Sequence, residues 1–234
     1  MKVAILQSNY IPWRGYFDLI HDADVFVFYD CVQYTKNDWR NRNIIYTRNG
    51  KQWLTIPVSS DAVKGTIDEV QLINSRWQQK HHRALFIGYK QAPFFPQLEE
   101  LANEFLLARQ WTSLSELNKH LIMSISRRLG CKTKFVNARE LSPRGNRVER
   151  LIDILRKIGA SHYISGKAAA GYLFGKEALF HEHGVELLYK NYAVYKPYRQ
   201  LADPFEQSVS ILDMVANLSW LDIPSHIWSS HGSN

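Results

Sequence analysis

Two short apolar segments near the beginning of the chain, separated by an amphipathic stretch, constrain its fold more than any other feature. The first segment covers residues 3–6 and the second covers residues 25–29. Between them, residues 15–22 carry apolar side chains at the spacing of a helix that packs on a sheet. Strand, short helix and strand in this order predict the first βαβ unit of an α/β protein.

The rest of the chain predicts a similar alternation around a helical middle. Asn49-Gly50 lies between apolar runs at 44–47 and 52–57, and this dipeptide favours a hairpin because both residues tolerate positive φ. Further strands are expected at 70–73, 134–136, 162–165 and 185–189, and helices at 75–89, 97–108, 114–129, 147–158, 168–174 and 208–217. The sequence therefore predicts an α/β fold whose open, mostly parallel sheet is of the nucleotide-binding type, with a β-hairpin and a helical insertion.

We expect these elements to form a single compact unit, since 234 residues can bury a substantial core. Residues 1–74 would be an N-terminal α/β part with the main site loops, and residues 75–130 a helical subdomain. Residues 131–228 would complete the sheet, and residues 229–234 would be a tail.

Charge and cysteine content narrow the classes of function. The net charge of +7 is spread along the chain without a long basic block, which disfavours a nucleic-acid partner and favours a basic pocket for a phosphorylated ligand. Cys31 and Cys131 have neither metal-ligand spacing nor a disulfide pattern, so no metal site is expected. The sequence contains neither a signal-peptide pattern nor an apolar run of membrane-spanning length. We expect a cytoplasmic protein, and the sequence leaves a homodimer open.

The loop after the first strand carries one group of candidate binding residues. Ligands of open α/β sheets bind at the carboxyl ends of the strands. Gln7, Asn9 and Tyr10 offer hydrogen-bonding groups there, and Arg14 offers a guanidinium for an anion. A helix that begins at Gly15 would present free N–H groups and a favourable dipole to the same anion. The alternative is that this loop only shapes a turn and covers the core.

The segment after the second strand is the densest polar stretch of the chain. Its candidate binding residues are Gln33, Tyr34, Lys36, Trp39, Arg40, Asn41, Arg42 and Asn43. Their guanidinium and ammonium groups suit phosphates, their aromatic rings suit a base or a sugar face, and their amides suit hydroxyl groups. Asp30 is the candidate general base, because it ends a strand and burial can raise a carboxyl pKa toward neutrality. The alternative is a solvated, charged loop.

A third candidate, Ser165-Gly166-Lys167, lies between an expected strand and an expected helix. This placement suits a phosphate, although the segment is much shorter than a P-loop, and a structural role is equally compatible. Cys31 has no recognisable catalytic partner, so we expect a buried or half-buried thiol. The chain contains no H-E-x-x-H, C-x-x-C or G-x-S-x-G motif, which disfavours zinc hydrolysis and serine esterase chemistry.

Nearly the whole chain resembles the WbqC-like family, whose members usually occur in bacterial O-antigen and other surface-polysaccharide clusters. The most specific matching segments are 4–7, 9–10, 12–13, 15–17, 24–27, 32–35, 38–43, 77, 80–81, 163–166 and 210–213. The family typically has proline at the position of Ser8 and an acidic residue at that of Cys31. An acidic role there would fall to Asp30 alone in this chain.

The resemblance implies an enzyme that modifies a nucleotide-linked or lipid-linked sugar, often an amino sugar, by acyl, aminoacyl or related group transfer. A nucleotide or an acyl or aminoacyl donor would be the co-substrate. The alternatives are a non-catalytic protein of the same pathway that binds a sugar nucleotide or acts as a scaffold, and, ranked last, a nucleic-acid-binding protein. Residues 12–16 are also similar in placement to the HIGH-signature loop of adenylyl-transferring enzymes, but Trp13 and Tyr16 replace its two histidines.

Overall fold

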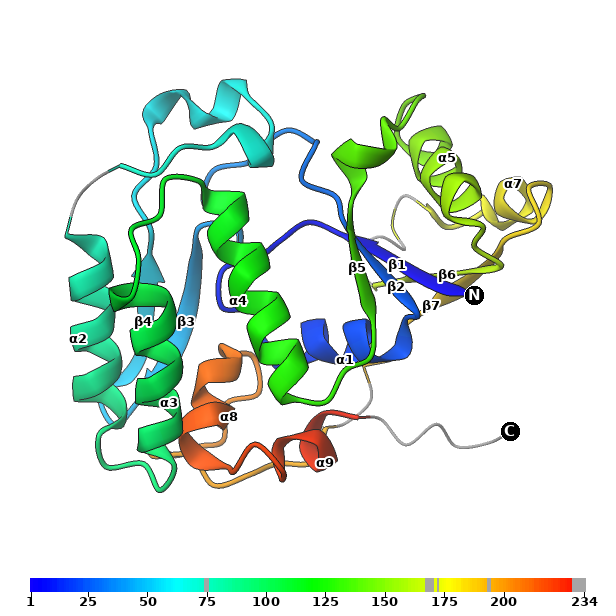
Figure 1. The fold of residues 1–234 in the computed structure, drawn as a ribbon. Helices are drawn as coiled ribbons and strands as arrows, with labels where there is room; N and C mark the ends of the chain where they lie inside the picture. The colour runs from blue at the N-terminus through cyan, green and yellow to red at the C-terminus, as the bar shows by residue number, and fades with distance from the viewer. Residues whose placement is uncertain (74–75, 167–170, 172, 193–194, 229–234) are drawn as a thin grey trace.

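The fold is built on a five-stranded sheet in which all neighbouring strands are parallel (Figure 1). The computed structural model describes residues 1–73, 76–166, 171, 173–192 and 195–228. The strand order is β5-β2-β1-β6-β7, and the strands are β1 (Lys2–Leu6), β2 (Val25–Phe28), β5 (Lys134–Asn137), β6 (His162–Ser165) and β7 (Glu186–Tyr189). The chain first proceeds outward from β1 to β5 and then returns to the other side of β1. The boundary between β1 and β6 is therefore the topological switch point, beside which doubly wound folds bind their ligands.

Helices cover both faces of this sheet, which explains the continuous apolar runs of its strands. On one face, Ala4, Phe26 and Ile164 belong to a core shared with α1 (Arg14–Asp22) and α4 (Leu114–Arg128). On the other face, alternate strand residues such as Val3, Val27 and Tyr163 pack against a separate core that includes α5 (Val148–Ile158) and α7 (Glu177–His181). The predicted α/β class is confirmed.

A hairpin and several helices extend the first core away from the sheet. The hairpin strands are β3 (Arg42–Thr47) and β4 (Gly50–Thr55), joined at Asn49-Gly50 as the sequence predicts. The helices that extend this core are α2 (Trp77–Tyr89), α3 (Phe95–Ala102), α8 (Ile211–Asn217) and α9 (Ile223–Ile227), of which α9 packs near α1. A π-helical turn, Asn103–Leu107, continues α3. Because buried residues of the hairpin, of α2, α3 and α4, and of α8 and α9 share one core with the sheet, this region packs as a continuous body.

Two local expectations differ from the structure or fall outside it. Residues 70–73 form no strand: Ile67–Glu69 is a 3₁₀ turn, and only the isolated bridges Val58↔Leu72 and Gln71↔Ser113 follow it. Most of the helix expected at 168–174, and the tail at 229–234, lie outside the described residues. Further 3₁₀ turns cover Ser60–Lys64 and Ala138–Leu141. In the described part of the chain, every helix is too short or too polar to cross a membrane.

Candidate functional site

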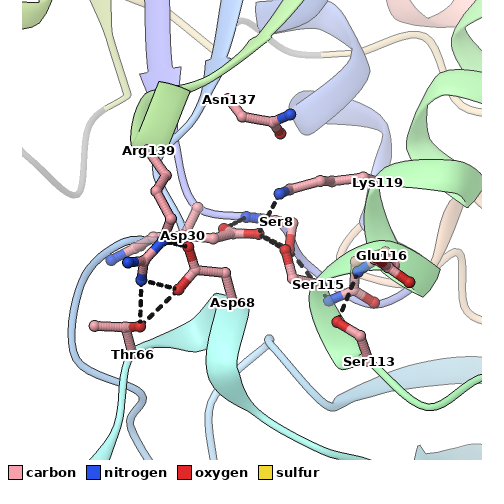
Figure 2. A network of polar contacts seen from close by, with 12 residues as sticks. Ser8, Asp30, Thr66, Asp68, Ser113, Ser115, Glu116, Lys119, Asn137 and Arg139 are labelled. Carbon is pink, nitrogen blue, oxygen red and sulfur yellow. Dashed lines mark hydrogen bonds and ion pairs between the residues drawn. The ribbon is translucent and has the colours of Figure 1, made fainter. Parts of the chain in front are cut away.

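The centre of the candidate site is the carboxylate of Asp30, just beyond the end of β2 (Figure 2). Asp30 is only 1% exposed, and it accepts hydrogen bonds from the backbone N–H of Ser8 at 2.7 Å and from the Ser8 hydroxyl at 2.8 Å. The hydroxyl of Ser115, on α4, donates to the same carboxylate at 2.5 Å. Three donors therefore hold both oxygens of a buried carboxylate at the carboxyl edge of the sheet.

Lys119 joins this cluster from the next turn of α4. Its Nζ lies 3.9 Å from Asp30 Oδ2, and its side chain is 19% exposed against 1% for Asp30. Residues four apart lie on one face of a helix, which brings Ser115 and Lys119 to the same carboxylate. In Figure 2 the Lys119 side chain extends from α4 toward Ser8 and Asp30. Lys119 is thus the more accessible group of the pair, and its ammonium lies within ion-pair distance of Asp30.

Arg40 organises the loop beside this carboxylate cluster. Its guanidinium donates to Gln7 Oε1 at 2.7 Å and to Asn9 Oδ1, and it lies 3.5 Å from Asp38 Oδ2. The backbone carbonyl of Arg40 accepts a hydrogen bond from Asn118 on α4. The structure therefore brings Gln7, Asn9 and Arg40 together, as the sequence-based site requires, and ties them to the helix that carries Lys119.

A cavity of about 230 Å³ lies next to these amides. It is lined by Asn9, Pro12, Trp13, Trp39, Asn43 and Ser208. Trp39 is 44% exposed, and its ring stacks on that of Trp53 with centroids 5.7 Å apart. The guanidinium of Arg42 lies 4.5 Å from the centroid of the Trp53 ring. The cavity, which we call the tryptophan pocket, therefore has an exposed aromatic wall beside hydrogen-bonding amides, a combination suited to a sugar or a base.

Arg14 and Gly15 have a different environment from the one expected of an open anion site. Arg14 is 2% exposed, donates to the carbonyl of Lys196 at 3.0 Å and lies 4.7 Å from the centroid of the Tyr195 ring. Burial lowers the pKa of its guanidinium. A Cβ atom on Gly15 would lie 2.3 Å from the Trp13 ring, so the indole covers the beginning of α1 and requires a glycine there. This packing favours structural roles for both residues.

Tyr10 is likewise enclosed, and it bonds to His81 of α2, which in turn contacts the hairpin. Its hydroxyl lies 2.9 Å from His81 Nδ1, while His81 Nε2 faces the carbonyl of Thr55 at 3.2 Å. Because a carbonyl only accepts, Nε2 carries the ring proton and the Tyr10 hydroxyl donates to Nδ1. Burial lowers the His81 pKa to about 4 and so favours this neutral ring.

The remaining expected site residues divide between packing and surface. Tyr34 is buried, and the amides of Asn41 and Asn43 donate to the backbone carbonyls of Ile56 and of Tyr10 and Ile11, respectively. Gln33 donates to the carbonyl of Val63, and Arg42 to that of Asn37. Lys36 is exposed at the tip of the loop.

The third expected segment begins at the end of β6. Ser165 is 2% exposed, and its hydroxyl has no hydrogen-bond partner among the residues that the structure describes. The Tyr192 hydroxyl lies 3.0 Å from the position of a Cβ atom on Gly166. Lys167 lies outside the described residues.

Sequence reasoning missed the members of the site that α4 contributes. Ser115, Asn118 and Lys119 follow one another at helical spacing, and Ser115 and Asn118 are buried. Polar residues at the same helical spacing as Leu114, Leu117 and Leu121, which face the core, could have indicated a buried polar cluster. Their partner on the sheet was not deducible, because Asp30 lies far away in sequence.

In the described part of the chain, no group of three His, Cys, Asp or Glu side chains is placed to share a metal ion.

The strand order and the polar residues at the carboxyl edge of the sheet define the class of the chain: it is a doubly wound α/β protein with a polar site at its strand ends. The model of the WbqC-like protein family matches residues 7–223, and the chain belongs to this family. It is 41% identical over 221 residues to "Uncharacterized protein Rv1507c" of Mycobacterium tuberculosis, and the match covers 93% of this chain and 94% of that protein. No solved structure matches the chain.

Proposed function

We propose that the protein is an enzyme of bacterial surface-polysaccharide assembly that modifies a nucleotide-linked sugar, often an amino sugar, by acyl, aminoacyl or related group transfer. Membership of the WbqC-like family supports the pathway. The observation that carries the enzymatic part is the Asp30–Lys119 pair at the carboxyl edge of a doubly wound sheet. Asn118, on the same helix as Lys119, bonds to Arg40, which in turn bonds to Asn9 in the wall of the tryptophan pocket.

The tryptophan pocket is the proposed place for the sugar nucleotide. Trp39 offers a face for stacking, and the amides of Gln7 and Asn9 are held in position by Arg40. Arg40, assisted by Lys36 and Arg42, would meet the phosphates of this substrate, since guanidinium groups bind phosphate oxygens in pairs.

The chemistry follows from the two charged groups. An amine or hydroxyl of the sugar attacks the carbonyl carbon of the activated acyl group, the bond from that carbon to the donor's leaving group breaks, and the nucleophile loses one proton. The Lys119 ammonium would stabilise the negative charge that develops on the carbonyl oxygen. Asp30 fixes Lys119 and takes up the proton through the hydroxyl of Ser8 or Ser115, both hydrogen-bonded to it.

The test begins with calorimetric titration and thermal shift against UDP-, GDP-, CMP- and dTDP-linked sugars, with ATP and acyl-CoA as donors. We expect one sugar nucleotide to bind, and Arg40→Ala to lose that affinity while the protein stays folded. Retained affinity with a lowered melting temperature would contradict the assigned role of Arg40.

Turnover of the bound sugar nucleotide separates catalysis from binding alone. Lys119→Met should lower turnover at least about a hundredfold, the usual cost of losing a donor to the developing charge, with little change in affinity. Lys132→Met, which removes an exposed lysine elsewhere, is the matched control. If the ligand binds but Lys119→Met turns over as fast as the native protein, the enzymatic proposal fails. The second candidate, a non-catalytic sugar-nucleotide-binding or scaffolding protein, would then take its place.

A further inference from the structure

A second cavity, of about 650 Å³, lies across the sheet edge from the tryptophan pocket. Tyr29 and Val32, at the end of β2, line it together with Arg147 and Arg150 at the beginning of α5 and with Lys176 before α7. Tyr29 packs against the core of α5 and α7, whereas Asp30 is bonded to α4 on the opposite face. The two cavities thus lie on opposite sides of the sheet, since Trp13 packs against the core of α1 and α4 and Leu151 against that of α5 and α7. We call this one the basic cavity.

The charge of the basic cavity is uncompensated among its described lining residues. It is lined by two guanidinium groups and one ammonium group and by no described carboxylate. Arg150 donates its Nε–H to the carbonyl of Gly145 at 3.0 Å. The side chains of Arg147 and Lys176 make no hydrogen bond or ion pair with the part of the chain that the structure describes. A concave surface with three cations concentrates anions, and phosphate groups above all.

The backbone at Arg147 adds a second observation. The backbone of Arg147 has φ 46° and ψ −113°, a conformation that residues other than glycine rarely adopt. Such strain persists in folded proteins mainly where a side chain is needed at that place. Here it coincides with a cation that lines the cavity and has no partner among the described residues.

Other cations near the sheet edge are less free to take up phosphate. Arg14 is enclosed by aromatic rings, and the Trp13 indole covers the beginning of α1, where doubly wound proteins often hold phosphate. Arg40, bonded to Gln7 and Asn9, is already assigned to the phosphates of the sugar nucleotide. A transfer reaction has two substrates, and the tryptophan pocket, at about 230 Å³, is small for both.

We propose that the basic cavity binds the phosphate groups of the second substrate, the activated donor, so that sugar and donor approach the carboxyl edge of the sheet from opposite faces. The identity of the ligand as a donor rests on the proposed function. The proposal excludes a donor without phosphate, such as a free amino acid or a simple ester. The volume of the basic cavity, about 650 Å³, lies within the range of ligand pockets.

The test is a calorimetric titration of the full chain with inorganic pyrophosphate. Arg147→Ala/Lys176→Ala should weaken pyrophosphate binding at least about tenfold, as expected for losing two charged contacts. The control Lys132→Ala/Arg156→Ala removes two exposed cations elsewhere and should leave binding unchanged. Arg147→Gly is a second variant, because glycine adopts the positive φ without strain: it should keep or raise the melting temperature and still weaken pyrophosphate binding.

Unchanged pyrophosphate affinity in the cavity variants, or no binding to the native protein at millimolar concentration, would overturn the proposal. Loss of pyrophosphate binding in Arg40→Ala alone would place the phosphates at the tryptophan pocket and also overturn it. Arg147→Ala/Lys176→Ala should bind the sugar nucleotide as tightly as the native protein does, which would support two separate sites, whereas an equal loss of sugar-nucleotide affinity would contradict them. Titration with ATP and with CoA then identifies the donor: binding of ATP indicates an adenylate, and binding of CoA indicates a thioester. The effect of Arg40→Ala on sugar-nucleotide binding tests the proposed function separately. The proposed function and the proposed donor site can therefore fail independently of each other.

Discussion

Arg14 and Arg40 are both expected from the sequence to bind phosphate, yet they occupy opposite environments. Arg14 lies among Tyr195, Tyr198 and Phe205, with its guanidinium 4.7 to 5.8 Å from their ring centroids. Arg40 is 11% exposed and bonded to amides at the edge of the sheet. The same residue type therefore stabilises the fold in one loop and organises a candidate binding surface in the other. The role of each arginine depends on how completely the surrounding side chains keep a ligand away from its guanidinium.

The same contrast separates other residues of the two kinds. Tyr10 and His81 are buried and bonded to one another, whereas Lys119 and Trp39 retain access to solvent. We call the first set, around Arg14, Tyr10 and His81, the enclosed region, and the second, around Arg40, Lys119 and Trp39, the strand-end region. Substitutions in the enclosed region should change stability, and substitutions in the strand-end region should change binding and turnover.

The largest expected effect on stability is that of Arg14→Ala. It removes a buried side chain that packs on three aromatic rings and donates to the Lys196 carbonyl, so the free energy of unfolding should fall by about 4 kcal/mol. Urea denaturation measures this loss, with Arg40→Ala, expected to cost about 1–2 kcal/mol, as the matched variant. Equal losses in the two variants would remove the distinction between the regions.

The next effect is a pH dependence that originates in the enclosed region. His81 has a folded-state pKa of about 4, lowered by burial from 6.5. As the pH falls below 6.5, His81 becomes protonated in the unfolded chain, whereas in the folded chain it stays neutral down to about pH 4. The unfolded state is therefore favoured by proton binding, and the protein loses stability on acidification. The loss amounts to about 3 kcal/mol between these limits.

His81→Phe should remove that part of the slope, even though the variant is less stable at pH 7. The comparison is between the slopes of unfolding free energy against pH in the two proteins. Asp213, whose pKa burial raises to about 6, acts in the opposite sense and is present in both, so it cancels. Identical slopes would show that His81 takes up its proton over the same pH range in the folded and the unfolded chain.

The smallest expected effect belongs to the exposed wall of the tryptophan pocket. Trp39→Ala should lower affinity for the sugar nucleotide about tenfold, or about 1.4 kcal/mol, through lost stacking, and change stability by less than about 0.5 kcal/mol. Calorimetric titration and thermal unfolding measure the two quantities. Phe174→Ala, which removes a ring that is 83% exposed, is the control and should change neither. A large loss of stability with intact affinity would move Trp39 to the enclosed region.

Local patterns in the sequence were enough for much of the fold. Alternation of apolar segments predicted the α/β class, and Asn49-Gly50 predicted the hairpin that β3 and β4 form. The expected strand at 70–73 was wrong: residues 67–69 turn as a 3₁₀ helix, and the segment after them forms only single bridges. Short apolar runs carry little information about hydrogen-bond partners, which lie far away in sequence.

The sequence by itself determined which edge of the molecule carries polar side chains, because those side chains follow the strands directly. Only the tertiary structure decided which of them face a ligand. Asp30 meets Ser115 and Lys119 because α4 packs across the sheet, and Arg14 is enclosed because residues 195–205 fold back over it. Burial and charge pairing depend on contacts between distant segments, and such contacts leave no periodic pattern in a single sequence.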